Sequence, residues 1–395
     1  MDLTSILGYC KLQEIPRQMV MNYIKRTIEG EITDRLFKSK AVLVYGPRQC
    51  GKTTLVRHIT ESIKDSVWLT GDNPAHINAL TNITLEGWRN IIGTGNLIVI
   101  DEAQQIPGIG RSMKLAIDAF PGKQFIATGS SSFDLANKAA EPLTGRKFEF
   151  RLLPMSYREL CNGKPAAESE HLETRLRFGS YPEIVLNPDD APRRLAELAG
   201  SYLYRDLFSL DSIKKPSIFS KLVRALAFQI GNEISINELS ALIGADNKTI
   251  DKYLDLLEKS FVLFRLHAFS ANGRNEIRKS SKIYFWDTGI RNAVLGNMLP
   301  LSARTDTGAL WENYLVVERL KKNMNEPFPP RSFYWRDRQQ HEVDYIEETA
   351  SGISAWEFKW NPSKKTGHPP RAFSALYPRA AFASFSQDNY SSFII

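Results

Sequence analysis

The chain has 395 residues, of which 43% are hydrophobic and 24% charged, and its formal net charge is +7. This length predicts about two or three domains with apolar cores. No apolar run approaches the roughly 20 residues of a membrane-spanning helix, and three widely spaced cysteines argue against a disulfide framework or a zinc site. We therefore expect a cytoplasmic protein with no signal peptide and no membrane contact, whose basic charge permits a nucleic-acid partner without requiring one.

The first segment, residues 1–36, carries apolar side chains at helical spacing and is predicted to form an N-terminal helical extension. Residues 37–160 then alternate strand patterns with helix patterns, which indicates an α/β domain with a parallel sheet. Within it, an apolar strand is expected at residues 41–45 and a helix from about residue 52 to residue 63. The loop between them reads GPRQCG.

This loop and the residues after it fit the phosphate-binding pattern G-x-x-x-x-G-K-[ST] in full. The glycines allow a tight bend in which successive N–H groups point at a phosphate, and the next helix directs the positive end of its dipole there. Lys52 is expected to reach the β- and γ-phosphates, and the Thr53 hydroxyl to bind Mg²⁺. The sequence therefore predicts that ATP and Mg²⁺ are bound by Gly46, Pro47, Arg48, Gln49, Cys50, Gly51, Lys52, Thr53 and Thr54.

Two further strands are expected to end beside this loop. The strand at residues 96–100 is followed by Asp101, which is placed to hold Mg²⁺ through water, and by Glu102, which is placed to orient or deprotonate the attacking water. The alternative for this acidic pair is a cap on the next helix. The strand at residues 123–128 leads to Ser130 and Ser131, whose hydroxyls are candidates to sense the γ-phosphate or the attacking water. The alternative is a serine that caps a helix beginning near residue 133.

Hydrolysis often needs a positive charge on the γ-phosphate in the transition state. Arg146 is the first candidate for this role, in cis or on a neighbouring subunit, and Arg151 and Arg158 are the alternatives. An arginine in this region can equally be a surface or ion-pair residue. Action in trans implies a homo-oligomer, such as a hexameric ring.

Taken together, these motifs resemble one family. The segments GPRQCGKTTL, LIVIDEAQ, IATGSSS and LTGRKFEFRLLPMSYREL are similar in kind and order to those of prokaryotic AAA-type ATPases that carry a C-terminal domain of unknown function. The same holds for GSYPE at 179–183, YRDL at 204–207, YFWDTG at 284–289 and the block from Trp335 to Lys359. The resemblance covers nearly the whole chain and implies a RecA-like ATPase core, but it does not imply a biological task.

Beyond the core, residues 161–216 are expected to form a helical lid or linker and residues 217–290 a winged-helix-like domain. The pattern there is a short helix that ends at Gly244, a second helix to about Lys259, and a strand. In this interpretation a nucleic-acid groove would be faced by Asn247, Lys248 and Lys252, and a wing would present Arg274, Arg278, Lys279 and Lys282. The alternative is a helical module for packing or oligomerisation. Acidic residues on the second helix argue against sequence-specific reading of DNA.

Residues 291–395 are predicted to form a second α/β domain, in which strand alternation puts Glu357 and Lys359 on one face. Asp344 followed by Glu357-x-Lys359 resembles the PD-(D/E)xK nuclease fold, as the C-terminal domain of this family generally does. The resemblance implies a Mg²⁺ site made by Glu312, Asp344 and Glu357, with Lys359 stabilising the charge of the transition state. The alternative is a fold used for DNA docking or assembly without cleavage.

Three functions follow as hypotheses. The first is a Mg²⁺-dependent ATPase that binds DNA and remodels it or moves along it. The second is an ATP-regulated, Mg²⁺-dependent DNA nuclease. The third is an ATP-dependent switch that assembles with a protein partner and has no activity on DNA. The phosphate loop is common to all three, so the distinction depends on residues 235–282 and 312–359.

Overall fold

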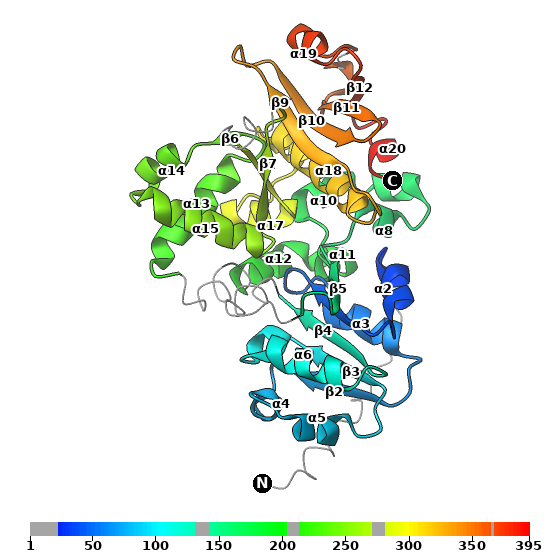
Figure 1. Ribbon diagram of the computed structural model, residues 1–395. Coiled ribbons are helices and arrows are strands. Elements are labelled where there is room, and N and C mark those ends of the chain that lie inside the picture. Colours follow the sequence, from blue (N-terminus) through cyan, green and yellow to red (C-terminus); the bar gives the residue numbers. More distant parts are fainter. Residues whose placement is uncertain (1–22, 131–142, 202, 204–212, 271–280, 365–366) are drawn as a thin grey trace. The chain divides into compact units, whose positions relative to one another are not determined.

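The computed structural model of the chain describes residues 23–130, 143–201, 203, 213–270, 281–364 and 367–395 (Figure 1). The chain divides into two compact units at residue 153, and each unit is described by itself. None of the described helices is long and apolar enough to cross a membrane.

Unit 1 is built on a five-stranded sheet in the order β2-β3-β4-β1-β5, in which every neighbouring pair is parallel. This confirms the parallel sheet predicted from the alternation of strands and helices. The strands are β1 (Ala41–Tyr45), β2 (Ser66–Thr70), β3 (Leu97–Asp101), β4 (Gln124–Gly129) and β5 (Lys147–Arg151). The helices are α2 (Glu29–Arg35), α3 (Lys52–Thr60), α4 (Pro74–Leu80), α5 (Leu85–Ile92) and α6 (Ile109–Ala119). Of the predicted N-terminal helical extension, residues 1–22 lie outside the described residues, and the described part contains α2.

Both faces of this sheet are covered, which explains why its central strands are continuous apolar runs. Leu43 of β1 packs in one core with Trp88 of α5 and Met113 of α6. Its neighbours Val42 and Val44 point into the opposite core, which α2 and α3 complete, because successive strand side chains alternate. Since the strands are parallel, the carboxyl ends of β1, β3 and β4 meet at one edge of the sheet.

Unit 2 begins with short helices, three of which (α10, α12 and α13) pack against α17. These helices are α8 (Tyr157–Cys161), α9 (Pro165–Ser169), α10 (Leu172–Phe178), α11 (Pro182–Leu186), α12 (Ala191–Ala199), α13 (Pro216–Phe228) and α17 (Thr288–Leu295). Asp287 caps α17 by accepting from the Ile290 N–H at 3.0 Å, and it also accepts from the Ser180 N–H at 2.8 Å. A Cβ at Gly179 would lie 2.0 Å from the Asp287 carboxylate. The segments GSYPE and YFWDTG therefore contact each other and hold these helices together.

A three-stranded antiparallel sheet in the order β6-β8-β7 follows α13. Its strands are β6 (Glu233–Ile234), β7 (Leu263–His267) and β8 (Ser281–Phe285). The helices α14 (Ile236–Ile243) and α15 (Asn247–Lys259) lie between β6 and β7 in the chain. α14 ends at Gly244, whose φ is 77°, and Asp246 caps α15 by accepting from the Thr249 N–H at 2.9 Å. The predicted sequence of helix, glycine turn, helix and strand is present. Three of the basic residues expected on a wing, Arg274, Arg278 and Lys279, lie outside the described residues.

The C-terminal part carries a four-stranded sheet in the order β12-β11-β10-β9, in which β11 and β12 are parallel and the other pairs antiparallel. Its elements are α18 (Thr307–Asn323), β9 (Arg331–Arg336), β10 (Glu342–Thr349), β11 (Gly352–Phe358), α19 (Arg371–Leu376), β12 (Ala381–Phe385) and α20 (Ser391–Ile394). Ala268, just after β7, pairs with Tyr334 of β9, so the two sheets of unit 2 meet edge to edge. α18 contacts both β8 and β11.

Candidate functional site

The phosphate loop lies between the end of β1 and the start of α3. Gly51 has a φ of 95°, a left-handed conformation that glycine adopts most easily. A Cβ at Gly46 would lie 1.9 Å from the Leu152 carbonyl oxygen, so this position has no room for a side chain. The buried Lys52 ammonium donates to the carbonyls of Gly46 (3.1 Å) and Pro47 (2.8 Å) and is thus held inside the loop. Among the other loop residues, Pro47 and Cys50 are buried, Arg48 and Thr53 are half-buried, and Gln49 and Thr54 are exposed.

The carboxylate of Asp101, at the end of β3, lies beside this loop. Both of its oxygens are 2.9 Å from the Thr53 hydroxyl, and it also accepts a hydrogen bond from the Thr128 hydroxyl near the end of β4. Burial raises the pKa of Asp101, although the hydroxyls of Thr128 and Thr53 that donate to it act in the opposite direction. Oxygen groups from three neighbouring elements converge here, and oxygen is the ligand atom that Mg²⁺ prefers. The donor set therefore fits the metal that the sequence predicts.

Glu102 follows in a left-handed conformation with φ 48°, which is sparsely populated by non-glycine residues. Its N–H donates to the Thr128 hydroxyl at 3.1 Å, and its carboxylate accepts from the Gln104 amide at 2.5 Å. The same Gln104 amide group accepts from the Ser130 N–H at 3.2 Å, and the other candidate serine, Ser131, lies outside the described residues. The Glu102 side chain makes no capping hydrogen bond to the helical turn after it, so the capping alternative has no support. Hydrogen bonds instead join Thr53, Asp101, Thr128, Glu102, Gln104 and Ser130 in one series.

Arg146 lies at the other end of the sheet. Its carbonyl accepts from the N–H of Ala41, the first residue of β1, whereas the phosphate loop follows the last residue of β1. Five strand residues span about 16 Å, and the Arg146 guanidinium forms an ion pair with Asp118 at 2.6 Å. This geometry therefore argues against Arg146 acting on the γ-phosphate of its own chain. Its action on the nucleotide of a neighbouring subunit stays a prediction. Arg151 is at the loop end of β5, where its Nε donates to the Tyr45 hydroxyl at 3.2 Å. Arg158 is exposed on α8 of unit 2.

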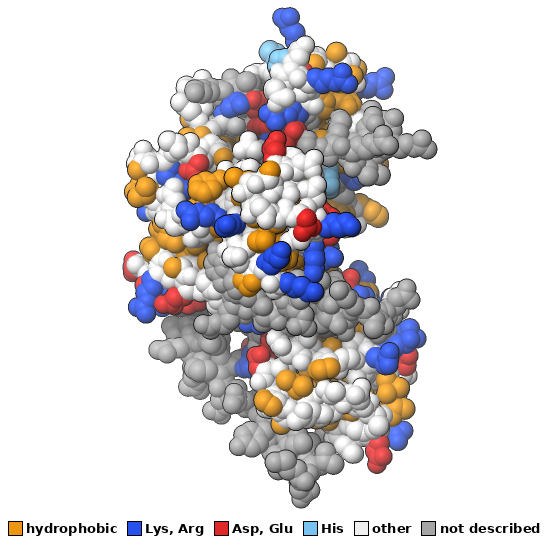
Figure 2. All heavy atoms as spheres, turned by 90° about the vertical axis from the view of Figure 1, so that its left-hand side faces the viewer, with side chains coloured by type: hydrophobic (Ala, Val, Ile, Leu, Met, Phe, Trp, Pro, Cys, Tyr) orange, Lys and Arg blue, Asp and Glu red, His pale blue; other side chains and the backbone are white. Residues whose placement is uncertain are grey.

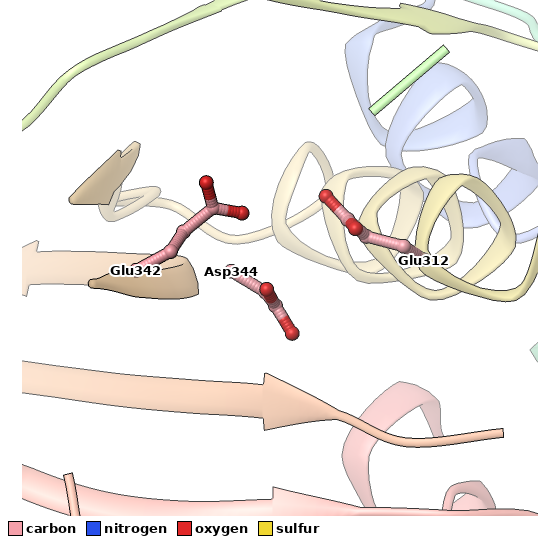
Figure 3. Close-up of side chains that lie close together, drawn as sticks. All are labelled: Glu312, Glu342 and Asp344. Atoms are coloured by element: carbon pink, nitrogen blue, oxygen red, sulfur yellow. The ribbon is translucent and has the colours of Figure 1, made fainter. Parts of the chain in front are cut away.

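A second cluster of ionisable groups lies in unit 2, where α18 meets the two sheets. Glu312 of α18 and Glu342 and Asp344 of β10 each offer a carboxylate oxygen, and these three atoms lie within 4.8 Å of one another. Figure 3 shows Glu312 and Glu342 pointing toward each other from opposite sides. The ammonium of Lys282, on β8, lies 2.8 Å from Glu312 and also contacts Glu342. The Lys282 side chain is 1% exposed, so a cation of the chain itself occupies the acidic cluster.

The charges of this cluster depend on one another. Burial, with Glu312 nearby, raises the pKa of Asp344 to about 8, although Lys282 and the Phe358 N–H, which donates to Asp344 at 2.7 Å, act in the opposite direction. Burial by itself would lower the pKa of Lys282, but the surrounding carboxylates outweigh it and raise that pKa. The Tyr284 hydroxyl donates to Glu312 at 2.6 Å. The cluster therefore contains one lysine that stays charged and one carboxyl group that favours its neutral form.

The predicted metal set is thus changed in two respects. Glu312 and Asp344 come together as expected, but the third carboxylate of the cluster is Glu342, while Glu357 forms an ion pair with Lys359 at 2.5 Å. Lys359 lies just after β11. Burial by itself would lower the pKa of Lys359, but the hydrogen bond to Glu357 and the charge of Asp344 outweigh it and raise that pKa. The expectation that Lys282 faces DNA from a wing is wrong, because its side chain is buried against carboxylates of α18 and β10.

Sequence reasoning missed three groups of the two sites: Thr128, Gln104 and the occupant Lys282. Thr128 and Gln104 stand within motifs already singled out, each two residues from a predicted site residue, so their position gave a usable signal. For Lys282 the signal was the alternation of its strand. Residues two apart share a face of a strand, so Lys282 belongs on the same face as Tyr284, and both bond to Glu312.

Comparisons with known proteins agree with this architecture. Residues 38–161 match a family model described as "AAA domain", residues 169–300 one described as "Domain of unknown function (DUF8612)", and residues 307–390 one described as "Domain of unknown function (DUF4143)". Unit 1 is therefore a P-loop domain of the kind found in AAA ATPases, which implies that it binds a nucleotide.

The chain belongs to the same family as "Uncharacterized protein Rv2008c" of Mycobacterium tuberculosis, to which it is 30% identical over 341 residues that cover 85% of this chain and 74% of the relative. "Uncharacterized protein MJ1544" of Methanocaldococcus jannaschii is 26% identical over 345 residues, which cover 81% of this chain and 75% of that one. Among solved structures, the Walker-type ATPase paby2304 of Pyrococcus abyssi aligns with a TM-score of 0.49 at 17% identity, over 70% of this chain and 97% of that one.

Proposed function

We propose that the chain is a Mg²⁺-dependent ATPase. The observation that carries this proposal is the hydrogen-bonded series at one sheet edge, which joins Thr53 of the phosphate loop through Asp101 and Thr128 to Glu102. Mg²⁺ bound there supplies a positive charge that polarises the phosphates. Thr53 and Asp101 hold it, Lys52 binds the phosphate oxygens, and Glu102 accepts a proton from the attacking water.

The proposal includes DNA as the partner on which the energy of ATP acts. Its support lies in unit 2, where α13, β6, α14, α15, β7 and β8 follow one another in the order expected of a winged helix. At the start of α15, Asn247, Lys248 and Lys252 are exposed, as contacts to phosphates require. Figure 2 shows the side of the molecule that carries these helices, where Lys and Arg side chains lie among hydrophobic ones.

The acidic side chains of α15 limit what this surface can do. Arg265 of β7 forms ion pairs with Asp255 (2.8 Å) and Glu258 (2.5 Å) and lies 3.7 Å from Asp251. These carboxylates are thus partly neutralised within the unit. The basic residues near the start of α15 are Lys248 in its first turn and Lys252 in its second, and lysines favour binding to the DNA backbone over reading of bases.

ATP turnover by the purified full chain, with and without duplex, branched and single-stranded DNA, tests this proposal. We expect turnover that requires Mg²⁺ and rises with DNA, and Glu102→Gln should bind ATP yet hydrolyse it at least 100-fold more slowly. Equal turnover by Glu102→Gln and the wild-type chain would remove Glu102 from the mechanism. Absence of DNA binding at low salt, with turnover intact, would leave an ATPase that acts on a protein partner.

A second candidate is Mg²⁺-dependent DNA cleavage in the C-terminal domain. It is favoured by the convergence of Glu312, Glu342 and Asp344 near Lys359. Carboxylates can bind a metal, and a lysine beside it can stabilise the negative charge that develops on a phosphodiester as it is cleaved. It requires Lys282 to leave the cluster, because its ammonium contacts two of the three carboxylates. Strand cutting that disappears in Lys359→Ala would support this candidate, whereas an uncut substrate at millimolar Mg²⁺ would exclude it.

A further inference from the structure

Arg26, a residue outside the phosphate loop, donates a hydrogen bond to that loop. The residue precedes α2 and is only 4% exposed. Its Nη1 donates to the Cys50 carbonyl at 2.9 Å, and its Nη2 donates to the Leu153 carbonyl at 2.7 Å. One guanidinium therefore joins the phosphate loop to the segment that follows β5.

The contact to Cys50 fixes the direction of the peptide group between Cys50 and Gly51. A trans peptide is planar, so its C=O and N–H point in opposite directions, and the described residues contain no cis peptide. Because Arg26 draws the Cys50 carbonyl toward itself, the N–H of Gly51 must point the other way. Gly51 is the last residue before α3, where N–H groups bind phosphate.

Arg26 is itself held in place by its own segment. Its backbone N–H donates to the Glu29 carboxylate at 2.5 Å, and the Tyr23 hydroxyl donates to the same carboxylate at 2.6 Å. The Tyr23 ring stacks on His58 of α3 with ring centroids 4.1 Å apart, and Ile28 and Ile32 pack in the core with Leu55 and Val56 of α3. The segment is thus anchored on the helix that carries Lys52.

We propose that Arg26 is a positioning residue for the nucleotide phosphates, which keeps the Gly51 N–H directed at them. The inference rests on the proposed binding of ATP. Lysine can replace the charge of Arg26 but presents no planar fork, so it cannot hold two carbonyls in fixed directions in the same way.

Titration calorimetry with ADP and with ATP–Mg²⁺ tests this, on the full chain and on Arg26→Gln, Arg26→Lys and the control Arg35→Gln. Arg35 is an exposed residue of α2. We expect Arg26→Gln to weaken binding of both nucleotides by about 10- to 100-fold, Arg26→Lys to weaken it less, and Arg35→Gln to stay within twofold. In turnover assays the KM of Arg26→Gln should rise by more than its kcat falls.

The outcomes separate this inference from the ATPase proposal. Unchanged Kd values in Arg26→Gln overturn the role of Arg26. An unchanged Kd with fewer binding sites per chain also overturns it, because that result means that Arg26→Gln only unfolds part of the protein. If the wild-type chain binds ATP but does not hydrolyse it, the ATPase proposal fails while the affinities still test Arg26. A wild-type chain that binds no nucleotide overturns both.

Discussion

Replacing Lys282 by methionine tests what holds the acidic cluster of unit 2 together. The substitution keeps most of the side-chain volume but removes the ammonium that contacts Glu312 and Glu342. These carboxylates are 17% and 23% exposed, so water replaces the lost charge only in part. Removing one partner of a buried ion pair costs about 3–5 kcal/mol, and because the carboxylates are not fully buried we take about 3 kcal/mol.

This loss should appear as a lower melting temperature of unit 2. For a domain of this size, about 1 kcal/mol corresponds to roughly 2–4 °C, so Lys282→Met should melt about 6–12 °C below the wild-type chain. Lys359→Met is the matched control. Lys359 pairs with the neighbouring Glu357 and its side chain is 31% exposed, and its loss should cost less than about 1 kcal/mol.

Adding a divalent cation to Lys282→Met then shows whether Lys282 occupies a site that can bind a metal or forms an ion pair with a structural role alone. With the ammonium gone, Mn²⁺ or Mg²⁺ can take its place among three carboxylates, and a ligand at 100 times its Kd stabilises by about 2.7 kcal/mol. We expect the metal to restore most of the lost melting temperature in Lys282→Met and to change the wild-type value by less than 2 °C. An equal metal-induced rise in both chains would refute the view that Lys282 keeps a metal out.

Three further changes have defined outcomes. Thr128→Val removes the hydroxyl that links Asp101 to the Glu102 N–H; turnover should fall about tenfold while the Kd for ATP stays within threefold, and an unchanged kcat would contradict this. Gly179 has φ 75°, and Gly179→Ala places a Cβ against the Asp287 carboxylate, so it should destabilise unit 2 by at least about 3 kcal/mol in chemical denaturation. The control is Gly163→Ala, where φ is 76° but the added Cβ meets open space, so it should cost only about 1 kcal/mol. Because the pKa of Asp344 is raised to about 8, the native state keeps a proton that the unfolded chain releases above about pH 4. The free energy of unfolding should therefore fall as pH rises from about 4 to 8, and this slope should be shallower in Asp344→Asn; an equal slope in both chains would contradict the raised pKa.

The features that sequence predicted well are those set by neighbours in the chain. The phosphate loop depends on two glycines and a lysine that lie within seven residues, from Gly46 to Lys52. The strands before and after it depend on short apolar runs, so unit 1 could be anticipated in detail. Arg146 shows where this ends. Arg146 is near the core motifs in sequence and directly precedes β5. Because β5 runs parallel to β1 and begins beside Ala41, Arg146 lies far from the phosphate loop, which follows Tyr45.

The acidic cluster was harder to predict, because its members are brought together by packing between elements. Lys282 reaches Glu312 across 30 positions and Glu342 across 60, and no local pattern encodes these pairs. The register of β10 against β9 also shifts between Val343 and Ile346. The expectation that Glu357 is the third ligand came from the resemblance of Asp344 and Glu357-x-Lys359 to a nuclease motif, and that motif takes no account of Glu342, which lies two residues before Asp344 on β10.

The two clusters differ in how their charges are satisfied, and this difference assigns them different tasks. In unit 1 the Lys52 ammonium is held only by neutral carbonyl oxygens of the loop, so its positive charge remains for an anion to meet. In unit 2 the Lys282 ammonium already contacts two carboxylates, and it joins β8 to α18 and β10. An ammonium without a direct ion-pair partner favours binding of an anionic ligand, whereas a matched buried pair fixes the elements that carry it. We therefore expect nucleotide chemistry in unit 1, and in unit 2 an ionic contact that keeps its two sheets together until Lys282 is displaced.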